Sequence, residues 1–413
     1  GSEMCIRDRK YGGAYMLIIK NGLIYDAVNR EPRVGTIVVR RGKIYNILYG
    51  QECNADAEDN GVEALENAGE HIEVIDAAGL NVYPGLVDAH SHLGLDGYAI
   101  GFESQDYNEM NDIVTPQLRA IDGFYPQDET VKLAREGGVT CVGTGPGSSN
   151  VLGGTFMAVK TYGNRVDDMV VKAPVAMKCA FGENPKRCYK DKGNYSRMTT
   201  AFRLRDMLKR AEEYNIKLQG ATEDESKLPP YDAKLEAMLP VIRGELPLKA
   251  HAHRADDIFT AIRIAKEFGV GLTIEHCTDG ALIADELAKE GFPVAVGPSF
   301  GHATKYELRN KSFMTPGILA KAGCQVSIIT DAPVIPQQYL ALCAGLAVKS
   351  GMDEFASLQA ITINPAKHLT IENRVGSIEV GKDADFAISL GNIMNSESIL
   401  KYTVIDGNIV YTG

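Results

Sequence analysis

The sequence predicts an α/β protein, a closed (β/α)8 barrel with a small β-sandwich domain built from both chain ends. Three observations support this class. Roughly eight apolar strand-like runs alternate with helical patterns over about 270 central residues, as in parallel strands joined by helical crossovers. Both chain ends carry apolar runs broken by Asn-Gly or Asp-Gly, which is a strong hairpin signal. Several histidines close predicted strands, where barrels of this kind gather their functional groups.

The two ends of the chain are expected to form one small domain, residues 16–83 with 370–413. "LIIKNGLIYD" near the start and "YTVIDGNIVYT" near the end resemble each other, and "TIVVRRGKIYNIL" adds a further hairpin. Residues 1–15 are expected to be a disordered extension left over from expression, and the acidic stretch 54–71 a surface excursion. The barrel is then assigned to residues 84–369.

The central elements follow in order. Strands are predicted for "VYPGLVDAHSH", "GGVTCVGT", "PVAMKCAF", "LPLKAHAH", "VGLTIEHC", "FPVAVGP" and "CQVSIITDAP". Helices are predicted between them, including "ADDIFTAIRIAKEFG", whose Ile258, Ile262, Ala265 and Phe268 form one apolar stripe. The Gly- and Ser-rich segment 143–155 lacks the ending of a phosphate-binding loop, so it predicts a lid or a plain strand–loop–strand connection.

Composition excludes several classes of protein. The formal net charge of −11 disfavours nucleic acid as a partner, and no run reaches the ~18 apolar residues of a membrane span. The eight cysteines are scattered without a CxxC pair, which argues against a disulfide framework and a structural zinc site. With no secretory signal visible, we expect a cytoplasmic enzyme or binding protein.

The histidine pattern predicts a metal centre. His90 and His92 are two residues apart in a strand, so both side chains lie on one face. "KAHAH" and "TIEHC" close two further strands with histidines, and "IITDAP" closes the last strand with Asp331. Five of the eight histidines and this aspartate therefore fall on one rim of the barrel, and imidazole with carboxylate suits Zn²⁺ or a similar ion.

These motifs, with the tail "AITINPAKHLTIENRVGSIEVGKDADFAI", resemble the amidohydrolase superfamily, nearest to its imidazolonepropionase-like and prolidase-like branch. The resemblance implies a TIM-type barrel with a binuclear zinc centre, for which Mn, Fe and Co are alternatives. His90 and His92 would bind the more buried ion, and His251 and His276 the more exposed one. Asp331 would ligate the first ion and act as general base and acid for metal-activated hydroxide.

Two ligand choices stay open. Binuclear relatives often bridge their ions with a lysine carboxylated on its amine, and Lys178 in "VAMKCAFGENPKR" has the shape of that motif. Glu183, five residues later, is the rival bridge and otherwise a rim residue near the substrate. His251 is favoured over His253 as the ligand of the fifth strand, which leaves His253 to contact substrate.

Further rim residues are candidates for substrate binding. Arg254 follows the fifth-strand pair, and Arg187 lies in "GENPKR"; a guanidinium fits a carboxylate in two parallel hydrogen bonds. His302, just after the seventh strand, is a further candidate, with a plain surface histidine as the alternative. His368, in the tail motif, is expected to be a helix residue without a catalytic role.

The first functional hypothesis is a metal-dependent amidohydrolase that cleaves an amide, cyclic amide or dipeptide-like C–N bond of a small polar substrate. A mononuclear deaminase of a ring amine is the alternative, although its usual Glu after His251 is absent here. A lactonase is a third reading, and a scaffold without metal is least favoured because every expected ligand is present. Relatives commonly form dimers or larger assemblies, which leaves a homo-oligomer as an open expectation.

Overall fold

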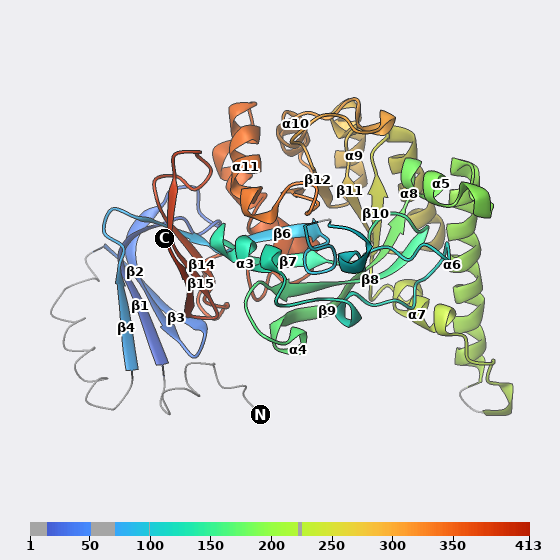
Figure 1. Cartoon of the computed structure of the whole chain (residues 1–413), viewed down its shortest axis with the longest axis horizontal. Coiled ribbons are helices and arrows are strands. Elements are labelled where there is room, and N and C mark those ends of the chain that lie inside the picture. Colours follow the sequence, from blue (N-terminus) through green and yellow to red (C-terminus); the bar gives the residue numbers. More distant parts are fainter. Residues whose placement is uncertain (1–14, 51–70, 99, 222–224) are drawn as a thin grey trace.

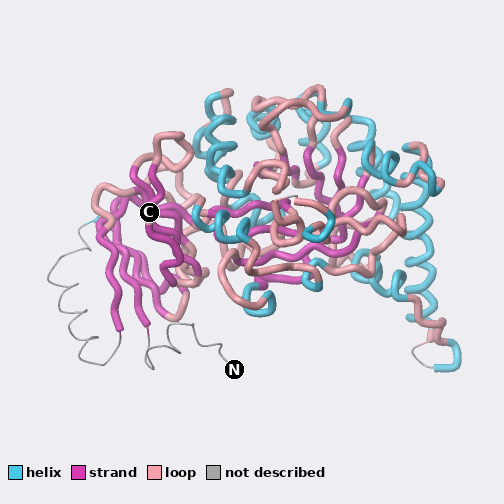
Figure 2. The backbone as a smooth tube through the Cα atoms, in the orientation of Figure 1, coloured by secondary structure: helices cyan, strands magenta, loops and turns pink. Residues whose placement is uncertain are grey.

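The computed structural model describes residues 15–50, 71–98, 100–221 and 225–413. Figure 1 shows a β-rich part that carries the C-terminus and, beside it, a larger part in which helices flank a second sheet. In Figure 2 the magenta strands of the larger part lie among cyan helices, whereas those of the smaller part stack together at the left. Within the described ranges, we find no helix with both the length and the apolar character needed to cross a membrane.

The first sheet combines strands from both chain ends. Its order is β3 (Lys43–Tyr49), β2 (Arg33–Arg40), β1 (Tyr15–Ile24), β5 (Asn81–Pro84), β14 (Phe386–Leu390), β15 (Ile399–Ile405) and β16 (Asn408–Thr412), and β4 (His71–Asp76) also pairs with β1. The joint between the two ends is the antiparallel pair β5–β14, in which Val82 lies opposite Ile388. In Figure 1 blue and red strands therefore lie side by side.

Alternating apolar residues explain this sheet. Leu17 and Ile19 of β1 and Ile37 and Val39 of β2 are buried in one core, together with Phe386 from the C-terminal end. The predicted union of both chain ends thus appears as strand pairing. A face-to-face sandwich and the domain boundaries stay predictions. Tyr15 already belongs to β1, while the rest of the expected N-terminal extension and most of the expected acidic excursion lie outside the described residues.

The second sheet has eight strands in chain order and is nearly closed. They are β6 (Leu86–Ser91), β7 (Val139–Thr144), β8 (Leu152–Lys160), β9 (Val170–Ala180), β10 (Leu248–Ala252), β11 (Leu272–His276), β12 (Val294–Val296) and β13 (Val326–Ile328). Neighbours from β9 to β13 pair in parallel. This agrees with the α/β barrel class predicted from the sequence.

Strand β8 departs from that prediction, because it runs antiparallel to both β7 and β9. A parallel crossover needs a dozen or more residues, and only residues 145–151 separate β7 from β8. Inside β8, Gly154 lies at a register shift against β9 and has φ +119°, and a side chain there would meet the Leu118 carbonyl oxygen at 2.4 Å. The Gly- and Ser-rich segment is therefore the strand–loop–strand connection, and the barrel is not built of eight equal units.

Hydrogen bonds beyond the last strand join β13 to β6. The Asp331 N–H donates to the His90 carbonyl at 3.2 Å, and the His92 N–H donates to the Ala332 carbonyl at 2.8 Å. The buried Asp88 carboxylate accepts from the Thr330 N–H at 3.0 Å and the Thr330 hydroxyl at 2.7 Å. These bonds hold the first and last strands of the barrel together at their carboxyl ends.

The helices cover the outside of this sheet (Figures 1 and 2). In α8, Ile258, Ile262 and Ala265 are buried as the predicted stripe requires, and Phe268 is half-buried. The described α-helices are α3 (Glu129–Glu136), α4 (Val166–Met169), α5 (Glu183–Cys188), α6 (Arg197–Gly220), α7 (Ala233–Ile242), α8 (Ala255–Phe268), α9 (Ala284–Glu290), α10 (Thr315–Ala322), α11 (Leu340–Lys349), α12 (Glu354–Gln359) and α13 (Ile363–His368).

Candidate metal centre

Five histidines meet at the carboxyl ends of the barrel strands. The ring centroid of His251 lies 4.6 Å from that of His253 and 4.4 Å from that of His276. His90 lies 5.1 Å from His276 and 5.5 Å from His92, again between ring centroids. All five side chains are buried. The strand ends β6, β10 and β11 thus bring these histidines together, as the rim hypothesis predicts.

Asp331 and Lys178 complete the cluster from β13 and β9. Asp331 Oδ1 lies 3.4 Å from His92 Nε2 and 3.6 Å from His90 Nε2. Lys178 Nζ lies 3.0 Å from His90 Nε2, and its side chain is fully buried. The nitrogen and carboxylate atoms of His90, His276 and Asp331 lie within 4.8 Å of one another, as do those of His251, His253 and His276. Either set can hold a metal ion.

The outer ring nitrogens of these histidines are anchored by the barrel. His92 Nδ1 contacts the Gly145 carbonyl at 2.7 Å, and His276 Nδ1 contacts the Gly297 carbonyl at 2.8 Å. His253 Nδ1 lies 2.8 Å from the Thr278 hydroxyl. A carbonyl accepts only, so the rings of His92 and His276 carry their proton on Nδ1, and each leaves Nε2 with a free lone pair.

Several atoms of the cluster are buried without a hydrogen-bond partner. They are both ring nitrogens of His251, Nε2 of His276 and Oδ1 of Asp331. Buried polar atoms normally find partners, because leaving them unpaired costs free energy. Imidazole nitrogens and a carboxylate oxygen are ligands of Zn²⁺ and similar ions, so these residues fit a bound metal.

The pKa shifts of the cluster's side chains favour the protonation states that bind a cation. Burial lowers the pKa of His276 to about 4, and burial with the nearby His276 and His253 lowers the pKa of His251 well below its usual value. Burial opposes ionisation of Asp331, but His276 and His92 outweigh it and lower the pKa of that carboxyl. Burial lowers the pKa of Lys178 to about 8. Neutral imidazoles and an ionised carboxylate are the forms that bind metals.

The backbone is strained at two of these residues. His276 has φ 71° and Asp331 has φ 54°, both in the left-handed region that side chains other than glycine seldom adopt. Strain of this kind costs about 1–3 kcal/mol per residue and clusters at functional sites. The alternation of apolar residues in the sequence does not predict this backbone strain.

Glu183 contacts Glu307, which in turn approaches His251 and His253. Its N–H donates to Glu307 Oε2 at 2.8 Å, and Glu307 Oε1 lies 3.9 Å from Nε2 of both His251 and His253. Lys305 pairs with the same Glu307 oxygen at 2.7 Å. Of the two proposed bridges, Lys178 contacts His90, and the choice between them stays a prediction. The buried Glu307 lies near His251 and His253, and sequence reasoning missed it.

The structure does not bring the two predicted arginines into the cluster's contacts. Arg254 precedes α8 and forms two 2.9 Å hydrogen bonds to Asp256, both on the surface. Arg187 is exposed in the last turn of α5. His302 is exposed as well, and its carbonyl accepts from the Lys311 amine at 3.0 Å. Their predicted roles in substrate binding stay predictions.

Buried residues behind the histidines were also missed. Glu275 Oε2 lies 3.0 Å from His90 Nδ1 and 2.9 Å from Lys249 Nζ. Its other oxygen lies 2.8 Å from Nε2 of His368, which lies in α13 as predicted but is buried against the site. Two weak signals existed: an acid next to a strand-end histidine in "TIEHC", and a lysine two residues before His251, hence on the same face.

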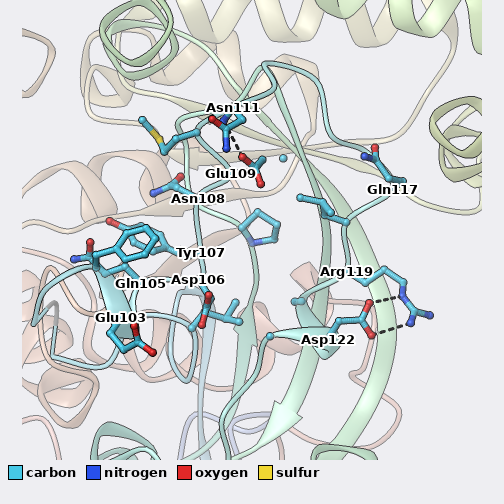
Figure 3. Close-up of a pocket in the computed structure, with 18 residues that line it drawn as sticks. Glu103, Gln105, Asp106, Tyr107, Asn108, Glu109, Asn111, Gln117, Arg119 and Asp122 are labelled. Carbon is cyan, nitrogen blue, oxygen red and sulfur yellow. Dashed lines mark hydrogen bonds and ion pairs between the residues drawn. The ribbon is translucent and has the colours of Figure 1, made fainter.

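A cavity of about 620 Å³ lies near the cluster, although no residue of the cluster lines it. Tyr107 lines it, and its ring lies 5.1 Å from that of His92 between centroids, tilted by 41°. Gly153 also lines it, and a side-chain carbon there would lie 3.7 Å from Lys178 Cγ. Figure 3 shows a polar lining that includes Glu103, Gln105, Asp106, Asn108, Glu109, Asn111, Gln117 and the ion pair of Arg119 with Asp122.

Comparisons with known proteins agree with this architecture. A family model described as "Amidohydrolase family" matches residues 198–410, more than half of the chain. The solved structure of an amidohydrolase from Thermotoga maritima MSB8 is 38% identical, with a TM-score of 0.88, and the alignment covers 96% of this chain and 100% of that one. A solved Xaa-Pro dipeptidase shares the fold at 18% identity and a TM-score of 0.56, over 96% of this chain and 100% of that one.

A longer relative aligns over most of the chain. Amidohydrolase tasK of Hapsidospora irregularis is 26% identical over 422 aligned residues, which cover 91% of this chain and 41% of that protein. The chain thus spans less than half the length of this curated relative.

Proposed function

The chain belongs to the amidohydrolase family, and from this premise we propose that it is a metal-dependent hydrolase of carbon–nitrogen bonds. The observation that carries the proposal is the buried cluster of five histidines with Asp331 and Lys178, several of whose polar atoms have no partner. The substrate is a small polar amide, cyclic amide or dipeptide-like molecule.

The cluster offers ligands for two ions. His90, His92 and Asp331 would hold one ion, supported by the 3.4–3.6 Å approach of the Asp331 carboxylate to both imidazoles. His251 and His276 would hold the other, with the unpartnered Nε2 of His276 as support. His253 then contacts substrate, because its ring is fixed by Thr278 beside the same position. Zinc suits this donor set, with Mn, Fe and Co as alternatives.

Lys178 would help to hold the ions once its amine has reacted with carbon dioxide. The neutral amine forms a C–N bond to CO2 and releases one proton, which gives a carbamate with one negative charge shared by two oxygens. An unmodified ammonium at this position, 3.0 Å from His90 Nε2, repels cations, whereas the carbamate attracts them. An NMR spectrum of protein prepared with 13C-bicarbonate tests this: a carbamate carbon signal is expected, and it disappears in Lys178→Ala.

The bound ions supply Lewis acidity, which activates water near neutral pH and polarises a carbonyl. The chain's own residues do the rest. Asp331 is ionised, so its carboxylate accepts the proton of the attacking water and delivers it to the leaving nitrogen. The cavity beside His92 and Lys178 receives the rest of the substrate, and its carboxylate and amide groups suit a polar molecule that donates hydrogen bonds.

The division of the chain follows the two sheets. We assign residues 16–83 and 370–413 to a β-sandwich domain and residues 84–369 to the catalytic barrel. The support is the strand pairing, since the joint β5–β14 connects the two ends and the barrel strands begin at Leu86.

Metal analysis combined with a substrate screen tests the proposed function. We expect up to two equivalents of zinc per chain and hydrolysis of at least one amide in a panel of dipeptides, N-acyl amino acids and cyclic amides. Asp331→Asn is expected to abolish turnover. A wild-type protein that does not bind zinc would refute the proposal. One equivalent of metal per chain, with release of ammonia from a ring amine, would favour the deaminase alternative.

A further inference from the structure

One carboxylate behind the histidines has four partners, Lys249 in an ion pair and the other three at hydrogen-bond distance. Glu275 Oε2 lies 3.0 Å from His90 Nδ1 and 2.9 Å from Lys249 Nζ. Glu275 Oε1 accepts from the Thr273 hydroxyl at 2.7 Å and lies 2.8 Å from His368 Nε2. All five side chains are buried, so these bonds are made without competition from water.

The donors come from different parts of the fold. Glu275 and Thr273 lie on β11, Lys249 on the neighbouring β10, His90 on β6 and His368 on α13. The Lys249 ammonium supplies the opposite charge that a buried carboxylate requires. The carboxylate is therefore held in one orientation from several sides, with one oxygen turned toward His90.

This contact decides the protonation of His90. An ionised carboxylate can only accept, so Nδ1 of His90 carries the proton and Nε2 keeps its lone pair. Nε2 is the atom that faces the site, 3.0 Å from Lys178 Nζ and 3.6 Å from Asp331 Oδ1. His92 and His276 achieve the same with backbone carbonyls, so among these three His90 is distinguished by a charged acceptor.

We propose that Glu275 is a positioning residue that holds His90 in its Nδ1–H form and thereby sets the affinity of the metal position formed with His92 and Asp331. Lys249, Thr273 and His368 orient the carboxylate. The inference rests on the proposed metal-dependent function and adds residues that the reaction itself does not touch. A charged acceptor behind a ligating imidazole raises its basicity and fixes its ring, and losing such a partner typically costs about 10–100-fold in metal affinity.

The tautomer can be measured in the wild-type protein. Long-range 1H–15N spectra of 15N-histidine-labelled, metal-free protein distinguish the two tautomers, and the His90 signal is identified by its loss in His90→Asn. We expect His90 with its proton on Nδ1. A proton on Nε2 would overturn the inference, and this reading needs no variant of Glu275.

Zinc affinity supplies the second test. Lys249→Met with Glu275→Met replaces the buried ion pair by apolar side chains of similar size, a change that proteins often tolerate, and leaves His90 Nδ1 without an acceptor. Lys249→Met alone is the matched control, because it keeps the carboxylate. We expect zinc binding, measured by competition with a chromophoric chelator, to weaken about 10–100-fold in the double variant relative to the control.

The outcomes separate the two proposals. A double variant that binds zinc as tightly as Lys249→Met contradicts the role of Glu275 and leaves the proposed function intact. A wild-type protein that does not bind zinc contradicts the proposed function itself. Circular dichroism establishes that both variants are folded, and if the double variant is not, the tautomer of His90 decides.

Discussion

Two buried lysines on neighbouring barrel strands have opposite surroundings. Lys160, at the end of β8, lies 2.5 Å from Asp385, 3.1 Å from Asp383 and 3.3 Å from Asp406, measured from Nζ to carboxylate oxygens. Lys178, on β9, contacts His90 at 3.0 Å and forms no ion pair with any carboxylate of the described ranges. Burial opposes charge on both amines, yet three aspartates raise the pKa of Lys160, whereas burial prevails and lowers the pKa of Lys178 to about 8.

The difference separates a lysine held in ion pairs from one whose amine is proposed to react. Lys160 stays charged and joins the barrel to the "GKDADF" segment that leads into β14, so its ammonium holds two parts of the fold together. Lys178 reaches its neutral form at much lower pH, and only a neutral amine can react with carbon dioxide. The same residue type at equal burial thus has a raised or a lowered pKa, according to its carboxylate neighbours.

The largest expected effect comes from Lys178→Ala. Removing the proposed bridge should lower metal content and turnover together, by at least about 100-fold in turnover, since even partners behind a ligand cost that much. Bicarbonate should not restore either. Elemental analysis and steady-state kinetics measure the two quantities.

The control for this variant is Lys172→Ala, an exposed lysine on the same strand. It should keep both metal and turnover. A Lys178→Ala protein with full metal content and full turnover would show that another group bridges the ions, and Glu183 would be examined first.

Lys160→Met should act on stability instead. It leaves buried aspartates without their cation, so we expect the free energy of unfolding to fall by about 3–5 kcal/mol, measured by urea denaturation. Lys43→Met is the matched control, because Lys43 pairs with Asp383 from a half-exposed position and should cost at most about 1 kcal/mol. Equal losses for the two variants would contradict the distinction between buried and exposed partners.

The two lysines should also give opposite pH dependence in metal-free protein. The folded pKa of Lys160 lies above its unfolded value, so its contribution is complete below about pH 10 and is lost only above it. The folded pKa of Lys178, about 8, lies below its unfolded value, so burying the ammonium costs stability at low pH.

The stability that Lys178→Met gains over wild type should therefore be greatest below pH 8 and shrink as the pH rises toward 10, whereas the loss in Lys160→Met should stay constant from pH 7 to 9. Denaturation curves across this range measure both. A gain for Lys178→Met that is independent of pH would argue against a depressed pKa at Lys178.

The smallest effect is expected from Arg254→Ala. Arg254 pairs with Asp256 at the surface. Exposed ion pairs contribute about 0–1 kcal/mol to the free energy of unfolding. Thermal denaturation should change little, and KM for any substrate found should stay within about twofold of wild type. A tenfold rise in KM would instead support the anion-binding role predicted from the sequence.

The sequence predicted the barrel class and the clustering of His90, His251, His276 and Asp331 from strand periodicity, and the family from the resemblance of its motifs. Residues that close parallel strands meet at one end of the sheet whatever the loops do. The family resemblance is confirmed by the match over residues 198–410. The individual ligand roles stay predictions.

What the sequence did not predict depends on contacts between distant segments. The antiparallel direction of β8 follows from a loop too short for a crossover. The alternation of apolar residues predicts a strand but not its direction. Glu275 and Glu307 are single acids whose partners lie on other elements. The surface position of Arg254 depends on whether its side chain turns to Asp256 or to the barrel mouth, and neighbouring sequence does not determine that.

The hydrogen bonds that join β13 to β6 involve the proposed ligands themselves, since His90 and His92 share backbone bonds with Asp331 and Ala332. The segments that carry the proposed ligands thus also complete the ring of strands. Backbone groups make these bonds, so a side-chain substitution such as Asp331→Asn can remove the proposed chemistry and leave the seam between β6 and β13 in place.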